Sequence, residues 1–285
     1  MPASPLTVPC RESRLLAAVK VSSIAEQLLF ATVRLETTNL AGGTGVATAF
    51  FFGVERNARQ YGFLVTNRHV IRNTSTGRIL FTVSENKQPI LGKTHGLNIL
   101  DFEKWWHTHS DPDVDIAIAP IGDAIRTITD KNIPIYHTFI HEYLIPDAKD
   151  VEEFDAIEEI VFAGYPNDIW DDVNNLPIIR RGVTATPLAV DFRGKKQFLI
   201  DASVFPGSSG SPVCILRIGG YSTKDGRFLL GNKLAFVGII SSVFCRRAEG
   251  TIEMAEAPTA MVPVPVSKEM IDLGVVLKAS LIGSS

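Results

Sequence analysis

The chain has 285 residues, of which 45% are hydrophobic, and its 28 basic and 31 acidic side chains give a net charge of −3. This balance argues against a broadly basic nucleic-acid-binding surface, and the apolar content is enough for a buried core. No run reaches the roughly 18 apolar residues that a membrane helix needs, and Leu15–Val19 is too short for the hydrophobic region of a secretory signal. We therefore expect a cytoplasmic protein that binds neither nucleic acid nor membrane.

Short strand-like segments dominate the first part of the chain. After an N-terminal arm at residues 1–24, runs rich in Val, Ile, Phe and Thr alternate with Gly, Asn and charged residues: Phe30–Leu35, Thr48–Val54, Gly62–Thr66, Arg78–Val83 and Asp115–Pro120. Such strands, without long helical periods between them, favour an all-β barrel or sandwich. We assign residues 25–122 to a first β-barrel.

Residues 123–158 break this rhythm, and we expect them to link two barrels. Acidic residues gather in the segment 147–159 among Val151, Phe154 and Ile157, whose spacing of three is typical of a short amphipathic helix. A solvated linker surface is the simpler interpretation of this acidity. The sharper one is that this segment and the arm 1–24 face a regulatory protein partner.

A second series of strands follows, and Ser267 is a candidate N-cap for a helix over Lys268–Lys278, with Met270, Ile271 and Leu273–Val276 as its apolar stripe. The expected strands are Glu159–Ala163, Gly182–Ala189, Gln197–Asp201, Pro212–Ile218, Phe228–Leu230 and Leu234–Val243. Residues 159–285 are therefore expected to form a second barrel with a C-terminal helix. Three widely spaced cysteines are not the pattern of a secreted disulfide scaffold, although a bridge between Cys214 and Cys245 stays open.

The segment Pro206–Pro212 reads Pro-Gly-Ser-Ser-Gly-Ser-Pro and is the most informative in the chain. It places Ser209 in a turn that can expose a hydroxyl group and leave backbone N–H groups free beside it. A serine that attacks carbonyl groups needs both features, together with a base and a group that orients the base. A glycine- and serine-rich turn without chemistry is the alternative.

His69 is the best candidate for the base, because of the six histidines only His69 ends a strand-like run, Leu64–Val70. His107 and His109 flank a polar loop without the cysteine or acidic cluster that would complete a metal site. We expect neither a metal nor a cofactor.

Asp115 is the best candidate for the orienting acid, with Asp113 in reserve. It leads directly into the apolar run Ile116–Ala119. A carboxylate bordering such a run lies at a solvent edge or has a specific hydrogen-bond partner, because burying an unpaired carboxylate is costly.

These residues resemble the motifs of chymotrypsin-fold (trypsin-like) serine peptidases, most of all the bacterial HtrA/Deg branch. Thr66–Val70 is similar to the histidine motif of that family, Asp115–Ile118 to its aspartate strand, and Gly207–Pro212 to Gly-x-Ser-Gly-Gly-Pro. The similarity extends over about residues 25–280 through the flanks Leu199–Ser203, Gly238–Ser241 and Thr259–Pro263. The α/β-hydrolase elbow is excluded, because Ser211 stands where that motif needs glycine.

The resemblance implies two six-stranded antiparallel β-barrels with a C-terminal helix. In contrast to typical HtrA chains, this chain is expected to have no PDZ domain, because no PDZ-like segment follows residue 280. The resemblance also implies a serine endopeptidase that acts on proteins or peptides through a triad of His69, Asp115 and Ser209. The oxyanion hole would consist of Gly207, Ser208 and Ser209, with the N–H groups of the first and last as donors. The substrate would lie against Ser203, Ser241, Ser242 and Val243, which favours a small or medium uncharged residue before the cleaved bond.

Two residues depart from the family pattern. Ser208 stands where digestive relatives have an aspartate that pairs with a new N-terminus after zymogen cleavage. That switch cannot operate here, so we expect regulation by loop ordering or by a partner. Ser211 replaces a glycine and is expected to add a side chain near the leaving-group side. The alternative function is a catalytically silent fold that acts as a protein-binding module.

Overall fold

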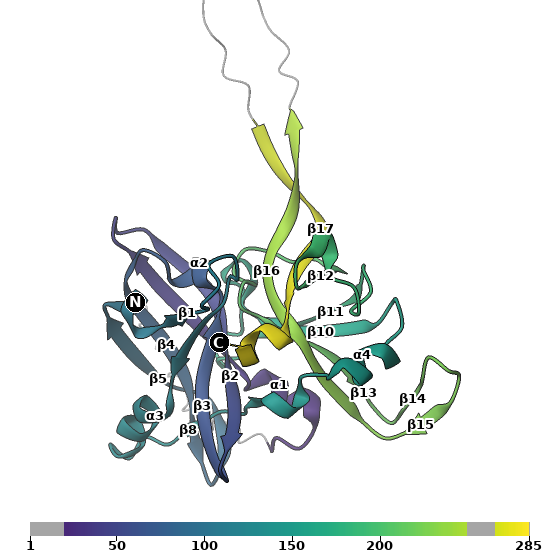
Figure 1. Ribbon diagram of the computed structural model, residues 1–285. Helices are drawn as coiled ribbons and strands as arrows, with labels where there is room; N and C mark the ends of the chain where they lie inside the picture. Colours follow the sequence, from purple (N-terminus) through teal and green to yellow (C-terminus); the bar gives the residue numbers. More distant parts are fainter. Residues whose placement is uncertain (1–19, 250–265, 285) are drawn as a thin grey trace, which may run out of the picture.

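The computed structural model describes residues 20–249 and 266–284. Its strands form a nine-stranded sheet, a closed six-stranded barrel and a separate two-stranded sheet. In Figure 1 the sheet built mostly from the first half of the chain (purple to blue) lies beside the barrel built from the second half (green to yellow). The chain is therefore mostly β, as expected, with one closed barrel and a second, larger sheet.

The nine-stranded sheet, called the first sheet below, has the strand order β5-β4-β1-β2-β3-β7-β6, while β8 pairs with β4 and β9 with β2. Residues 135–141, expected in the linker, thus add two short strands to this sheet. The strands are β1 Thr32–Asn39, β2 Thr44–Arg56, β3 Arg59–Thr66, β4 Thr74–Glu85, β5 Gln88–Leu100, β6 His107–Thr108, β7 Ala117–Pro120, β8 Ile135–Tyr136 and β9 Ile140–His141.

Strand β2 is buried on both of its faces. Phe51 packs with Leu64 in the core of the first sheet, whereas Phe50 and Phe52 pack against Phe236 of the barrel. Because successive side chains of a strand point to opposite faces, a strand covered on both sides has a continuous apolar sequence. This explains why β2 shows no alternation of polar and apolar residues, and it places β2 at the junction of the two halves.

The barrel has the strand order β10-β11-β12-β17-β16-β13 and closes where β13 pairs with β10. Its buried core includes Phe162, Phe198, Ile200, Val213, Ile240 and Val276. The strands are β10 Glu159–Gly164, β11 Ile178–Thr184, β12 Gln197–Asp201, β13 Pro212–Arg217, β16 Lys233–Glu249 and β17 Val266–Lys278. The separate sheet consists of β14 Gly220–Ser222 and β15 Phe228–Leu230.

The prediction of a helix over Lys268–Lys278 is wrong. These residues belong to β17, which pairs with β12 and with β16, for example Leu199 with Val275 and Ile240 with Val276. A short apolar run fits a buried strand as well as a helix, and β-branched valines favour the strand. The barrel needs β17 to close, so tertiary pairing decides the conformation. In the described chain β17 is followed by the 3-10 helix η5, Ala279–Ser284.

Helices are short and lie between the strands. The helix expected near 147–159 is present as α4, Ala148–Glu153, and begins with a capping box at Asp147. The other helical elements are α1 Ile24–Leu29, α2 Arg68–Ile71, α3 Gly122–Thr129, η1 Phe102–Trp105, η2 Glu142–Leu144, η3 Pro166–Asp168 and η4 Phe192–Gly194. Within residues 20–249 and 266–284, none of the helices has the length and hydropathy needed to cross a membrane.

Several acids of the segment 147–159 form ion pairs within the chain. Asp150 and Glu153 lie 3.4 and 3.6 Å from the ammonium group of Lys233. Glu158 pairs with Arg217, and both side chains are largely buried. Much of the acidity therefore fixes the linker to the barrel rather than standing free on the surface.

Candidate active site

His69 and Asp115 are brought together where β3 and β7 lie side by side. His69 is in α2, directly after β3, and Asp115 lies just before β7. The Nδ1 atom of His69 is 2.7 Å from Oδ2 of Asp115, and the backbone N–H of His69 donates to Oδ1 at 2.9 Å. The side-chain amide of the buried Asn67 donates to the Asp115 carbonyl at 2.9 Å. The backbone of His69 thus holds the Asp115 carboxylate, and the carboxylate in turn holds the imidazole.

The surroundings of Asp115 keep its carboxylate ionised. Burial opposes ionisation, but the hydrogen bonds and charge of His69, together with the Ser241 hydroxyl at 2.8 Å, hold the pKa of Asp115 below its usual value. An ionised carboxylate accepts a hydrogen bond from the Nδ1–H of the imidazole, which leaves Nε2 as the basic nitrogen. The His69 side chain is 44% exposed, so a substrate has access to Nε2.

Ser241 of β16 connects this pair to the serine turn. Its hydroxyl donates to Asp115, and its carbonyl accepts from the hydroxyl of Ser209 at 3.4 Å. Across the described residues, no hydrogen bond joins Ser209 directly to His69. Such contacts are commonly long without substrate and shorten in the reacting complex. Ser241, which the sequence predicts to contact substrate, therefore also occupies a connecting position that no local motif indicates.

In the serine turn, residues 206–211, the carbonyl groups of residues 206–209 all accept hydrogen bonds. The Pro206 carbonyl accepts from the N–H of Asn167 at 2.6 Å and the Gly207 carbonyl from the Thr48 hydroxyl at 2.9 Å. The Ser208 carbonyl accepts from Ser211 N–H at 3.0 Å, and the Ser209 carbonyl from Thr48 N–H at 3.1 Å. These four carbonyls are therefore each held in a fixed direction.

Fixed carbonyls also fix the N–H groups of the turn. In a trans peptide the C=O and N–H bonds point in opposite directions, and none of the described peptide bonds is cis. In the described part of the chain the N–H groups of Gly207 and Ser209 donate to no protein group, whereas that of Ser208 donates to the Phe205 carbonyl at 3.0 Å. Of the three residues expected in an oxyanion hole, two present free donors and Ser208 does not.

Two glycines of the turn are required by both conformation and space. Gly207 and Gly210 have φ angles of +91° and +87°. A Cβ on Gly207 would lie 2.2 Å from the Tyr165 carbonyl oxygen, and one on Gly210 would lie 2.0 Å from the carbonyl oxygen of Thr48. Only glycine fits a left-handed backbone against such close neighbours.

Ser208 and Ser211 point into the protein. Ser208 is 1% exposed and Ser211 is 0% exposed. A Cβ on Gly164 of β10 would lie 2.1 Å from the Ser211 hydroxyl, so this hydroxyl occupies the space above a glycine. The expectation that Ser211 adds a side chain near the leaving-group side is therefore wrong. The small neighbour at Gly164 is what allows serine there.

In the described part of the chain, no hydrogen bond or ion pair joins the remaining predicted residues to the His69–Asp115 pair. Asp113, the reserve acid, forms a local turn in which its N–H donates to Asp111 at 2.9 Å. Ser203 is partly exposed after β12, Ser242 is exposed on β16, and Val243 packs against the barrel core. Cys214 is a free, buried thiol, and burial raises its pKa to about 12.

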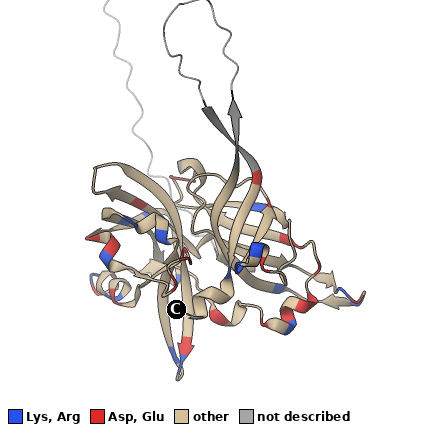
Figure 2. Cartoon of the chain, turned by 45° about the horizontal axis from the view of Figure 1, so that its top comes forward, with Lys and Arg blue, Asp and Glu red and all other residues tan. Residues whose placement is uncertain are grey.

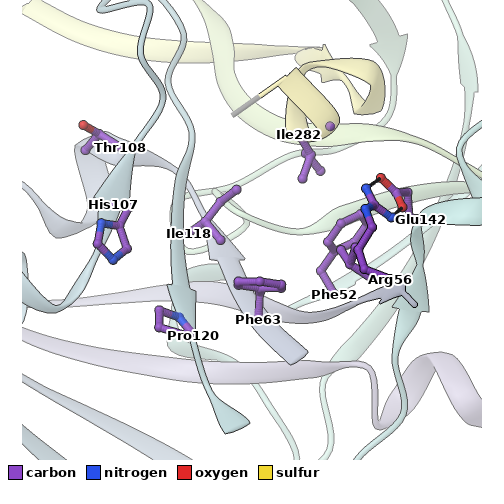
Figure 3. A pocket seen from close by; sticks show the side chains of 11 residues that line it. Phe52, Arg56, Phe63, His107, Thr108, Ile118, Pro120, Glu142 and Ile282 are labelled. Atoms are coloured by element: carbon purple, nitrogen blue, oxygen red, sulfur yellow. Dashed lines mark hydrogen bonds and ion pairs between the residues drawn. The ribbon is translucent and has the colours of Figure 1, made fainter. Parts of the chain in front are cut away.

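A cavity of about 330 Å³ lies away from the serine turn (Figure 3). Phe52, Phe63, Ile118 and Ile282 give it an apolar lining, and Arg56 and Glu142 form a two-bond ion pair at its edge, with distances of 2.5 and 2.9 Å. His107, which was considered for a metal pair, lies on its rim. The cavity closes against the C-terminal turn η5 and shares no residue with the serine turn.

Lys and Arg residues (blue) and Asp and Glu residues (red) are distributed over both halves of the described chain (Figure 2), in keeping with the net charge of −3.

Comparisons with known proteins give structural similarity only. No protein-family model and no curated protein sequence matches the chain. The chain is similar to the HtrA-type protease AlgW with tripeptide, with 14% identity and a TM-score of 0.47 over 90% of this chain and 59% of that one. It is also similar to the Rv3671c protease from M. tuberculosis in its active form, with 14% identity and a TM-score of 0.43 over 98% and 92% of the two chains.

A third similar structure is the tobacco vein mottling virus protease, with 10% identity and a TM-score of 0.43 over 92% of this chain and 82% of that one. All three are proteases. The chain spans less than two thirds of the AlgW chain. With TM-scores below 0.5, the functional assignment has to come from the side chains of this chain itself.

Proposed function

We propose that the chain is a serine endopeptidase that cleaves peptide bonds through an acyl-enzyme on Ser209. The observation that carries the proposal is the position of Ser241, which hydrogen-bonds both Ser209 and Asp115. A nucleophile, an acid and the imidazole that this acid orients thus belong to one network. The two free N–H groups beside Ser209 support the same chemistry, because acyl transfer needs donors for the developing oxyanion.

In the first half of the proposed reaction, the hydroxyl oxygen of Ser209 attacks the carbonyl carbon while Nε2 of His69 takes the hydroxyl proton. Asp115 stabilises the imidazolium that forms. The carbonyl oxygen becomes negatively charged and accepts hydrogen bonds from the N–H groups of Gly207 and Ser209. His69 then gives its proton to the leaving amine as the C–N bond breaks, and an ester remains on Ser209.

In the second half, a water molecule attacks this ester and His69 takes a proton from the water. The ester bond breaks, the proton passes to the Ser209 oxygen, and the new carboxylic acid leaves. All proton transfers use groups of this chain, so the proposal calls for no metal or cofactor.

The proposed substrate is a protein or peptide with a small or medium uncharged residue before the cleaved bond. Its main chain would lie along Ser241–Val243 of β16, next to Ser209. Ser203 carries no charge to select lysine or arginine, and we expect the side chain of Val243 to leave less room for a large substrate residue than a glycine would.

Regulation by loop ordering or by a partner remains part of the proposal. The four bonded carbonyls of the serine turn favour control of substrate access over ordering of the turn itself. We also predict a cytoplasmic location and a division into four parts: an arm at 1–24, a first barrel at 25–122, a linker at 123–158 and a second barrel at 159–285. The first sheet of the structure corresponds to the predicted first barrel.

A fluorophosphonate probe tests the proposal, because it reacts with activated serine hydroxyls. We expect the wild-type chain to be labelled, Ser209→Ala not to be labelled, and His69→Ala to be labelled far more slowly. Peptidase activity against casein should fall by about a million-fold in Ser209→Ala, the loss typical of removing the nucleophile. Ser222→Ala, an exposed serine on β14, serves as the control and should behave as the wild type.

Absence of labelling in the wild-type chain, with and without candidate partner proteins, would overturn the proposal. In that case the chain would be the catalytically silent binding module. Labelling that persists in Ser209→Ala would contradict the choice of nucleophile.

A further inference from the structure

Thr48 joins the two halves of the molecule at the serine turn. It belongs to β2 of the first sheet and is fully buried, with 0% exposure. Its hydroxyl accepts a hydrogen bond from the Tyr165 N–H at 3.2 Å and donates one to the Gly207 carbonyl at 2.9 Å. Both partners belong to the second half of the chain. A side chain of the first sheet therefore reaches across the junction and holds a peptide group of the turn.

The peptide group that Thr48 holds lies between the two free donors. Its carbonyl belongs to Gly207, and its N–H, which belongs to Ser208, donates to Phe205. The torsion angles on either side of this group, ψ of Gly207 and φ of Ser208, lie between the two donors, so a change in either angle alters the direction of one donor relative to the other. The Thr48 hydroxyl thus helps to fix how the two donors lie relative to each other, while the Pro206 and Ser208 carbonyls, which share peptide groups with the donors, are held by Asn167 and Ser211.

The Thr48 hydroxyl has room for these bonds because residue 164 beside it is a glycine. A Cβ on Gly164 would lie 2.7 Å from the Thr48 hydroxyl oxygen, so a side chain at that position would displace it. The backbone N–H of Thr48 bonds the Ser209 carbonyl and does not depend on the side chain. Removal of the hydroxyl alone would therefore leave the Gly207 carbonyl without its donor, while the contact to Ser209 stays.

We infer that Thr48 is a positioning residue of the oxyanion hole, acting through its hydroxyl bond to the Gly207 carbonyl. This inference rests on the proposed peptidase function. It predicts that the hydroxyl matters for turnover and not for substrate binding, because an oxyanion forms only in the transition state.

The test compares Thr48→Val, which keeps the shape of the side chain without its hydroxyl, with Thr48→Ser, which restores the hydroxyl. With p-nitrophenyl butyrate as substrate, we expect kcat of the valine variant to fall by about 10- to 100-fold and KM to change by less than about threefold. The serine variant should recover kcat to within about threefold of the wild type, because it restores the donor.

Thr184→Val is the matched control. Thr184 is also a buried threonine, whose hydroxyl accepts from Glu158 N–H at 2.8 Å and donates to the Ala156 carbonyl at 3.1 Å, away from the serine turn. Its loss should lower the melting temperature by a similar amount and leave kcat unchanged. Equal kcat values in Thr48→Val and Thr184→Val, or no recovery in Thr48→Ser, would overturn the inference.

Amide hydrogen exchange separates this inference from the proposed function. Exchange of a peptide covering residues 205–211, followed by mass spectrometry, should be about tenfold faster in Thr48→Val than in Thr184→Val, because the turn opens more often. Equal exchange in the two variants would show that Thr48 does not hold the turn, whether or not the chain hydrolyses anything. Failure of the wild type to react with the fluorophosphonate probe would instead reject the peptidase function.

Discussion

The two sides of the candidate site are held in different ways. On the base side, the backbone N–H and the ring of His69 are held by the charged carboxylate of Asp115, and the His69 side chain is 44% exposed. On the nucleophile side, the serine turn is fixed by bonds to its backbone carbonyls, and its inner residues Ser208 and Ser211 are buried. The first arrangement keeps Asp115 ionised and sets which ring nitrogen of His69 carries the proton, and the second sets the direction of the N–H groups in the serine turn.

This difference separates two kinds of sensitivity. The base side should respond to any change in the charge of Asp115, even when the shape of the side chain is kept. The nucleophile side should respond to changes of a single carbon atom, because the space behind the turn is filled by Tyr165 and Thr48. Two substitutions test this contrast, and a third concerns the stability of the first sheet.

The largest effect is expected on the base side. Asp115→Asn keeps the size of the side chain but removes the negative charge that orients and stabilises the imidazolium, so kcat should fall by about 10,000-fold with little loss of stability. Asp113→Asn, which changes a neighbouring acid without contact to His69, should leave kcat unchanged. A loss below about tenfold in Asp115→Asn would show that its charge is not used in catalysis.

The next effect is expected on the nucleophile side. In Gly207→Ala the new Cβ would lie 2.2 Å from the Tyr165 carbonyl oxygen, so the turn must move and one oxyanion donor is lost. We expect kcat to fall by about 100- to 1000-fold. The control Gly219→Ala also has a positive φ, +84°, but meets nothing within 4 Å, so it measures the backbone cost alone. Equal activities in these two variants would contradict a role for the space behind the turn.

The smallest effect concerns stability and extends the comparison to the core of the first sheet. The His137 ring lies 4.8 Å from the rings of both Phe51 and Phe139, and burial lowers its pKa from 6.5 to about 4. The unfolded chain binds a proton at this position below pH 6.5 that the folded chain refuses until about pH 4. The free energy of unfolding should therefore decrease as the pH falls through this window, by at most about 3 kcal/mol from this group.

Urea unfolding at pH 8 and at pH 4.5 measures this effect. In His137→Phe, which keeps an aromatic ring among its neighbours, the loss of stability on acidification should be smaller than in the wild type. At pH 8 His137 is neutral in both the folded and the unfolded chain. Any difference in stability between the wild type and His137→Phe at that pH therefore reflects packing and not protonation. The same pH dependence in both would show that the protonation of His137 does not contribute to acid sensitivity.

Much of the site could be read from the sequence because its residues stand in contiguous motifs. His69 ends a strand, Asp115 begins one, and Ser209 stands in a glycine-flanked turn. The structure brings the first two into contact and links the third to them through Ser241. Strands were recognised by their β-branched and aromatic residues, but their ends were not, because pairing partners far away in the chain decide where a strand ends.

What the sequence did not reveal depends on contacts between distant segments. Thr48 and Asn167 hold the turn from other elements, and no local motif marks them as partners of residues 206 and 207. A polar residue in the apolar run of β2 was the only available signal at Thr48. The segment 268–278 was assigned to a helix because its apolar spacing suits both structures, and only the closure of the barrel favours the strand.

The strand that closes the barrel is synthesised after all three residues of the candidate site. Strand β17, which pairs with both β12 and β16, comes after Ser209 in the chain. A chain still emerging from the ribosome therefore contains the serine, the histidine and the aspartate before it contains the strand that completes the barrel. Ile240 of β16 exchanges backbone hydrogen bonds with Gly210 and Ser211 and pairs with Val276 of β17, so the serine turn reaches its final surroundings only after β17 has been synthesised.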